Sequence, residues 1–353
     1  MVTALERQIR EIVAEEGPLT VERYMALCLG HYYGSRDPLG AGGDFTTAPE
    51  ISQMFGELLG LWSVAVWQAM GSPPLRLVEL GPGRGTLMVD ALRAARLVPA
   101  FLGSLSVHLV ETSPALRERQ RQALAAAGVP IAWHDRMEDV PPGPAIVLAN
   151  EFVDALPIRQ FVAAERGWHE RVVGLDGERL VFGLAPSPQP GPTPLPPPGT
   201  IREEAPVAAR TARALAERLA GQGGAALLVD YGYWGPATGD TLQALKAHAP
   251  IDPLTACGEA DLTAHVDFAA LAAAAQDGGA AVHGPSDQAS FLEALGIVER
   301  AASLKARANP AQGEAVEAAL RRLTDRAPAG MGSLFKVLGL SQPGLALPGL
   351  AAR

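Results

Sequence analysis

The segment VELGPGRGT carries three glycines at alternate positions, and an acid precedes them. The glycines are Gly81, Gly83 and Gly85. The acid, Glu79, lies near the end of an apolar run, 75–80, and a helical pattern, 86–96, follows the glycines. A glycine-rich turn lets the backbone approach a ligand closely, and open parallel sheets bind their ligands at this end of the strands. The pattern therefore predicts a ligand site at this turn; a turn that serves only strand–helix packing is the alternative.

The spacing of the glycines decides which ligands fit the turn. A dinucleotide site needs G-x-G-x-x-G, but Thr86 occupies the third glycine position, and a phosphate-binding P-loop needs a lysine that the turn lacks. Glu79 would repel a phosphate and attract a cationic group. A second acid, Glu111, ends the next predicted strand, 105–111, where its carboxylate can accept hydrogen bonds from both hydroxyls of a ribose. We therefore expect a positively charged ligand with a ribose, and no phosphate chain at the turn.

Carboxylate, glycine turn and ribose-binding carboxylate, in this order, resemble the class I S-adenosylmethionine (SAM) methyltransferases. Longer segments narrow the resemblance to the MidA-like family; they are GDFTTAPEISQMFGELLGLW, VELGPGRGT, NEFVDALPIRQF, LLVDYGY and GEADLTAHVDF. This family includes the mitochondrial complex I assembly factor that acts as a protein arginine methyltransferase, and many bacterial relatives. The resemblance implies SAM as the cofactor and an arginine side chain of a partner protein as the acceptor, with a role in respiratory complex assembly.

The resemblance also implies which residues contact the cofactor. The glycine turn, Glu79 and Glu111 fall on the family's SAM-binding positions. Asp135 and Met137 follow the third predicted strand, where class I enzymes contact the adenine. Asn150 leaves the sheet at the end of the fourth strand, next to the expected place of the methyl group.

Methyl transfer from a sulfonium is an in-line displacement that needs alignment and desolvation more than a strong acid or base. A guanidinium acceptor is protonated at neutral pH, so carboxylates near the cofactor could hold it and draw its charge from the attacking nitrogen. The segment NEFVDALP supplies Glu151 and Asp154, which would share one face of a first helical turn. We predict both as catalytic residues; Asp154 as a helix cap is the alternative.

The segment GGDFTTAPEIS is predicted to form a flap over the cofactor. Asp44 is a further catalytic candidate, Thr46 a cofactor contact and Phe45 a substrate contact, and Tyr33 would line the same pocket or pack in the core. The alternative makes Thr47 the N-cap of a following helix, with a capping box to Glu50.

Two further candidates come from the second half of the chain. Asp230 ends the fifth predicted strand, 225–232, and would border the substrate groove. His265 is a candidate substrate contact or general base, because imidazole titrates near neutral pH, or else a structural residue. The helix expected at 265–276 would take Asp261 or Thr263 as its N-cap. No spacing of histidines, cysteines and acids suits zinc, so we expect no metal.

Strand and helix patterns alternate from residue 75 onward, which predicts a parallel sheet covered on both faces. The predicted fold is α/β: a Rossmann-like, seven-stranded, doubly wound sheet of the class I methyltransferase type. We expect an N-terminal helical segment with the cofactor flap at 1–73 and the methyltransferase domain at 74–345. Insertions are expected at about 156–225, with a hairpin at Asp176-Gly177 and a Pro-rich loop, and at 285–328, which is helical.

Composition excludes several classes of protein. The 353-residue chain has a formal net charge of −9, which argues against nucleic acid as the main partner. The two cysteines, Cys28 and Cys257, suggest reduced thiols, no apolar run is long enough to span a bilayer, and we expect a cytoplasmic protein. The apolar helix 57–70, with Trp62 and Trp67, would be core or the face of a homodimer.

Two rival functions remain open at this stage. The same cofactor site could methylate a small molecule or another protein side chain. Alternatively, the chain could be an assembly factor that binds a client protein and keeps SAM as a structural ligand.

Overall fold

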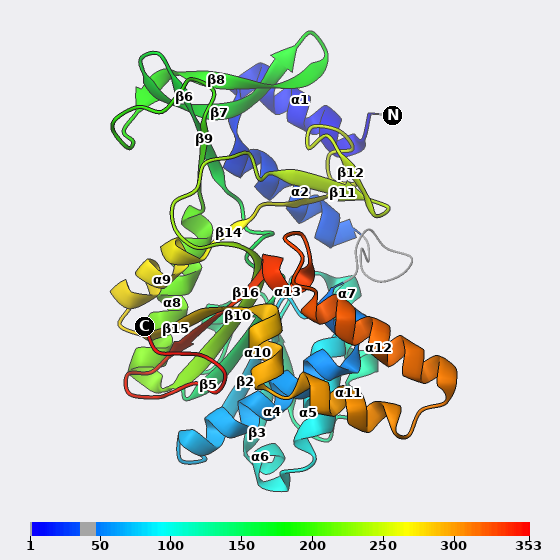
Figure 1. The fold of residues 1–353 in the computed structure, drawn as a ribbon. Helices are drawn as coiled ribbons and strands as arrows, with labels where there is room; N and C mark the ends of the chain where they lie inside the picture. Colours follow the sequence, from blue (N-terminus) through cyan, green and yellow to red (C-terminus); the bar gives the residue numbers. More distant parts are fainter. Residues whose placement is uncertain (1, 36–46) are drawn as a thin grey trace.

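The computed structural model describes residues 2–35 and 47–353, so the flap candidates Asp44, Phe45 and Thr46 lie outside it. A mixed sheet forms the centre of the larger part of the molecule (Figure 1). Its strands, in spatial order, are β15 (Ala281–Asp287), β16 (Phe335–Ser341), β10 (Gly224–Tyr233), β5 (Ala145–Asn150), β2 (Leu75–Leu80), β3 (Leu105–Val110) and β4 (Ile131–His134). A short strand, β14 (Val266–Asp267), pairs with the end of β10.

The register of this sheet confirms the predicted doubly wound fold. Neighbouring strands from β4 to β10 pair in parallel, whereas β16 runs antiparallel to both β10 and β15. The strands are nearly continuous apolar runs because both faces are covered. The chain leaves β2 toward β3 on one side and later returns to β5 on the other. This reversal opens a crevice at the carboxyl ends of β2 and β5, where ligands of such sheets bind.

Helices cover both faces of the sheet. Each face of the sheet forms an apolar core with its own set of helices. On one side lie α3 (Ala48–Ile51), α4 (Gln53–Ala69), α5 (Thr86–Ala95), α6 (Pro99–Ser104), α10 (Gln288–Ala294), α11 (Ile297–Lys305), α12 (Pro310–Thr324) and α13 (Met331–Leu334). The remaining elements of this part are α7 (Pro114–Ala123), the 3₁₀ turn η1 (Met137–Asp139), α8 (Pro206–Gln222) and α9 (Phe268–Asp277).

Helix α4 packs directly on α5 and belongs to the core of the sheet domain. A Cβ at Gly60 would lie 2.4 Å from the carbonyl oxygen of Ala91, so only glycine permits this close approach. Trp62 and Trp67 are buried within the chain, so of the two roles considered for this apolar helix, core or homodimer face, they belong to the core. The N-terminal segment that stands apart from the sheet is therefore shorter than the expected 1–73.

A second lobe lies above the carboxyl ends of the central strands and is built from three separate stretches of chain (Figure 1). The first stretch gives α1 (Ala4–Glu16), β1 (Leu19–Thr20) and α2 (Val21–Ser35). The second gives β6 (Arg159–Ala164), β7 (Gly167–Asp176), β8 (Arg179–Gln189) and β9 (Ile201–Glu204). The third gives β11 (Gln243–Lys246), β12 (Ala249–Ile251) and β13 (Asp261–Thr263).

These stretches share one apolar cluster, which includes Ile9, Tyr24, Val173 and Leu262. The predicted hairpin at Asp176-Gly177 is confirmed, because β7 and β8 pair across it. The inserted sheet covers a narrower range than the expected 156–225, since α8 packs on the central sheet with α9. None of the described helices has the length and apolar character needed to cross a membrane.

Candidate active site

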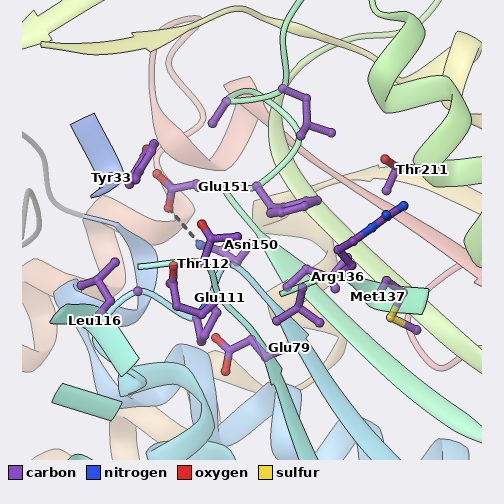
Figure 2. A pocket seen from close by; sticks show the side chains of 18 of the residues that line it. Tyr33, Glu79, Glu111, Thr112, Leu116, Arg136, Met137, Asn150, Glu151 and Thr211 are labelled. Atoms are coloured by element: carbon purple, nitrogen blue, oxygen red, sulfur yellow. Dashed lines mark hydrogen bonds between the residues drawn. The ribbon is translucent and has the colours of Figure 1, made fainter. Parts of the chain in front are cut away.

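The described residues line a cavity of about 880 Å³ at the carboxyl ends of β2 and β5 (Figure 2). It brings together residues that the sequence had marked from five separate segments. The predicted residues that line it are Tyr33, Glu79, Gly81, Gly83, Glu111, Asp135, Met137, Asn150 and Glu151. Gly85, Asp154, Asp230 and His265 are absent from the cavity wall that the described residues form.

The glycine turn follows β2 and adopts a backbone conformation that favours glycine. Gly81, Gly83 and Gly85 have φ values of 62°, 53° and 84°, in the left-handed region. Gly85 is also the N-cap of α5. A Cβ at Gly81 would lie 3.0 Å from the ring of Phe152, so the turn is tightly packed against the loop after β5.

Glu79 is buried beside this turn, and one of its oxygens lacks a partner. Its Oε2 forms no hydrogen bond with any of the described residues, although the side chain is only 3% exposed. Burial, with a smaller contribution from the negative charge of nearby Glu111, raises the pKa of Glu79 to about 8. The Oδ1 atom of Asn150 is a second buried oxygen without a partner in the described structure. Two buried acceptors on one cavity wall fit a cationic donor such as the ammonium group of SAM and disfavour a phosphate.

Glu111 is held in place by hydrogen bonds at the end of β3. Its Oε1 accepts from the backbone N–H of Ser113 at 2.8 Å, and its Oε2 accepts from Nε2 of Gln120 at 3.4 Å. Burial raises the pKa of Glu111, and these two hydrogen bonds oppose the rise. The arrangement fixes a carboxylate where it could accept hydrogen bonds from ribose hydroxyls. Nothing in the sequence singled out Gln120, because a glutamine inside a polar helix carries no pattern of its own.

The adenine candidates differ in exposure. The Asp135 carboxylate is 72% exposed and pairs with Arg117 at 2.7 Å. Met137 begins η1 and presents its side chain to the cavity (Figure 2). Arg117 also donates to the backbone oxygen of Glu111 at 2.6 Å, so it ties the ends of β3 and β4 together.

Glu151 faces the cavity from the loop after β5. Its Oε1 accepts from Asn150 Nδ2 at 3.0 Å and from the backbone N–H of Ala48 at 3.2 Å, across 103 residues of chain. The residue has a φ of 50°, which is unusual for a residue other than glycine; such strained backbone conformations cluster at functional sites. Burial, and next Asp154, raise the pKa of Glu151 to about 7. Figure 2 shows Glu151 between Tyr33 and Asn150.

Helix α3 forms another part of the wall, without the capping box considered from the sequence. Thr47 is the N-cap residue but makes no side-chain hydrogen bond to the helix. Glu50 instead accepts from the Thr86 hydroxyl at 2.5 Å, at the first turn of α5. Glu50 thus joins α3 to the segment after the glycine turn.

The predicted pairing of Glu151 with Asp154 on one helical face is wrong. Residues 151–156 form turns and no helix, so the two side chains point to different places. Asp154 is buried behind the cavity wall, and burial raises its pKa to about 6. Asp230 is also buried, and its Oδ2 accepts from the backbone N–H groups of Val153 and Asp154 at 2.9 and 3.1 Å. Asp230 therefore shapes the loop that carries Glu151 and does not border the cavity.

The second lobe reaches the cavity through Tyr33. The Tyr33 hydroxyl donates to Asp261 Oδ1 at 3.0 Å, which joins α2 to β13. Because Asp261 and Thr263 lie in β13, neither is the N-cap of the next helix. The helix begins at Phe268, and Asp267 is its N-cap.

His265 does not face the cavity. Its ring packs edge-on against Tyr231, with centroids 5.3 Å apart, and burial lowers its pKa. The position agrees with the structural alternative for this histidine. The described residues contain no group of three or more histidines, cysteines and acids that could hold a metal ion.

Comparisons with known proteins agree with this geometry. The sequence profile of the S-adenosyl-L-methionine-dependent methyltransferase family matches residues 58–286. The mitochondrial protein arginine methyltransferase NDUFAF7 of Danio rerio is 43% identical over 316 residues, which cover 80% of this chain and 74% of that protein. Its Drosophila melanogaster homologue, also mitochondrial, is 39% identical over 374 residues, which cover 96% and 84%.

A crystal structure of a COG1565 superfamily member from Burkholderia thailandensis, bound to S-adenosyl-homocysteine, is similar along nearly its whole length. The TM-score is 0.84 at 28% identity, with 99% of this chain and 95% of that chain covered. The expected cytoplasmic location is contradicted, because the curated relatives described above are mitochondrial proteins. The cofactor prediction is confirmed by the family profile. The chain belongs to the family of S-adenosyl-L-methionine-dependent methyltransferases.

Proposed function

We propose that the protein transfers a methyl group from SAM to an arginine side chain of a partner protein. Two relatives that are 39% and 43% identical are protein arginine methyltransferases. The observation that carries the proposal is the half-buried carboxylate of Glu151, which faces the cavity and, among the described residues, accepts hydrogen bonds from two neutral donors. A cationic side chain that enters the cavity would supply the missing positive charge.

The surroundings of Glu151 favour a cationic acceptor over a neutral one. Asp154 and Asp230 are buried behind it, and in the described part of the chain no lysine or arginine forms an ion pair with any of these three carboxylates. Desolvated carboxylates that lack an ion-pair partner are costly, so a bound guanidinium would relieve mutual repulsion as well as desolvation. A neutral metabolite would gain neither effect.

The residues of this chain would then act by binding, aligning and accepting a proton. When bound, SAM supplies a methyl group on a positively charged sulfur. Glu79 and Asn150 would hold the cofactor's ammonium group, and Glu111 its ribose. Glu151 would grip the guanidinium, align one of its nitrogens for in-line attack and accept a proton on a carboxylate oxygen as the methylated product forms. A carboxyl group with a pKa of about 7 is suited to accept that proton near neutral pH.

The flap residues Asp44, Phe45 and Thr46 stay in this proposal as contacts of the cofactor or acceptor. We propose a subunit of a respiratory complex as the first client to test, and no nucleic-acid partner, in keeping with the net charge of −9. A homodimer stays a prediction for solution measurement.

The test is methylation of arginine-bearing and lysine-bearing peptides with labelled SAM, read by mass spectrometry. The purified protein should label arginine peptides, and Glu151→Gln should lose this activity while it still binds S-adenosyl-homocysteine. Turnover on a metabolite with no peptide labelled would favour the rival enzyme. If a Gly83→Val variant no longer binds SAM but still supports assembly of the client, the protein would be a client-binding factor that keeps SAM as a structural ligand.

A further inference from the structure

Gln120 lies behind the cofactor cavity and connects three parts of its wall. The side chain comes from α7 and is fully buried, at 0% exposure. Its Nε2 donates to the backbone oxygen of Gly83 at 2.7 Å and to Glu111 Oε2 at 3.4 Å. Its Oε1 accepts from the indole N–H of Trp133 on β4 at 2.8 Å. One amide thus joins the glycine turn, the end of β3 and β4.

The chemistry of these partners fixes the orientation of the amide. An indole N–H can only donate, so the oxygen of Gln120 must face Trp133. The NH₂ group must then face the two acceptors, the Gly83 carbonyl and the Glu111 carboxylate. Both lie on segments that line the cavity, whereas Gln120 itself does not line it.

We propose that Gln120 is a positioning residue that holds the glycine turn and Glu111 at a fixed separation and thereby sets the affinity for the cofactor. Hydrogen bonds behind a site keep its contacting groups in the binding geometry before the ligand arrives. The proposal rests on the SAM site and not on the identity of the acceptor. It therefore stands or falls separately from arginine methylation.

A carboxylate in place of the amide separates positioning from simple packing. Gln120→Glu keeps an acceptor for Trp133 but turns a charged oxygen toward the Gly83 carbonyl and the Glu111 carboxylate. When that new acid is protonated, its O–H can donate again to one of the two acceptors. Of the charged groups, Glu111 bonds the amide directly, Glu79 and Arg117 act on Glu111, and Arg121 lies over the ring of Trp133. In the chain, Arg84 follows Gly83, and His134 and Asp135 follow Trp133. All of them are also present in the unmodified protein, so the ratio of the two dissociation constants isolates the new group.

The experiment measures the Kd for S-adenosyl-homocysteine by calorimetry from pH 5.5 to pH 8.5, on full-length proteins whose folding is checked by circular dichroism. Gln120→Met, which cannot donate, should weaken binding about tenfold at every pH. Gln120→Glu should weaken binding more at high pH. The Kd of this variant divided by the Kd of the unmodified protein should fall as the pH is lowered. The matched control is Gln122→Met, which should bind normally. Gln122 is an exposed glutamine two residues away, and its side chain donates to Glu118.

Two results would overturn the proposal. One is binding by Gln120→Met within twofold of the unmodified protein. The other is a Gln120→Glu ratio that does not change with pH, because a merely structural role predicts no such dependence. If neither variant folds, Trp133→Phe decides: it leaves the amide without its anchor and should weaken binding severalfold, and unchanged affinity would refute the role.

Discussion

Replacing Glu79 by glutamine should stabilise the cofactor-free protein at neutral and alkaline pH and weaken cofactor binding. The pKa of a glutamate in the unfolded chain is about 4.3, whereas burial raises that of Glu79 to about 8. The folded protein therefore holds a proton that the unfolded chain has lost. Its stability falls as the pH rises from about 4.3, and the loss levels off above the folded pKa of about 8.

The size of this effect follows from the shift in pKa. Each unit corresponds to about 1.4 kcal/mol, so the interval between the unfolded pKa and pH 7 amounts to roughly 3–4 kcal/mol. Glutamine does not titrate, but its buried amide brings a donor that needs a partner, which costs about 1–3 kcal/mol. The net gain at pH 7 is therefore small. The pH dependence of the difference between the two proteins is the larger signal.

Urea unfolding of both proteins, without cofactor, between pH 5 and pH 9 measures this difference. Glu151, Asp154 and Asp230 are present in both proteins, so their own titrations cancel. The free energy of unfolding of Glu79→Gln, minus that of the unmodified protein, should rise with pH and then level off. Two curves that stay parallel over the whole range would refute the raised pKa.

Calorimetry tests the functional half of the same prediction. A bound ammonium group favours the charged form of Glu79, so binding at pH 7 should release about one proton, seen as heats that vary with the ionisation enthalpy of the buffer. Glu79→Gln should bind S-adenosyl-homocysteine more weakly and release no such proton. Equal affinity and equal proton release in both proteins would remove Glu79 from the cofactor site.

Substitutions at three further residues test other parts of the site. Glu111→Ala should weaken S-adenosyl-homocysteine binding by about 1–3 kcal/mol in calorimetry, because ribose hydroxyls lose their acceptor; unchanged affinity would exclude this contact. The rate of methylation of an arginine peptide should fall about tenfold per pH unit below the Glu151 pKa of about 7, because only the ionised carboxylate holds a guanidinium. The Glu151→Gln variant should be roughly 100-fold slower, and its rate should not change with pH. A steep pH profile in the variant would contradict this role. Gly30 lies within α2, lines the cavity and has open space around its missing Cβ, so Gly30→Ala should raise the free energy of unfolding by about 0.5–1 kcal/mol, whereas Gly30→Leu should raise the KM for the acceptor with unchanged cofactor affinity. An unchanged KM would place the acceptor's path elsewhere.

Local sequence patterns were sufficient to predict the sheet and the part of the site that lies at the ends of its strands. Apolar strand runs and helical spacing are local signals, and the carboxyl ends of parallel strands meet at one edge. Glu79, the glycine turn, Glu111 and Asn150 each stand at such an end, so their convergence followed from the fold class. The glycines marked the turn because three φ values lie in the left-handed region.

The surroundings of these residues depend on packing between elements that are distant in the sequence. Glu151 meets the N–H of Ala48, and Tyr33 meets Asp261, across 103 and 228 residues of chain. Such contacts depend on how whole elements pack, which no local period encodes. Helical spacing had predicted Glu151 and Asp154 on one face. The turn after β5 instead places Glu151 in the cavity wall and Asp154 behind it. Gln120 shows the same limit, because a buried amide becomes informative only when its three partners have been brought together.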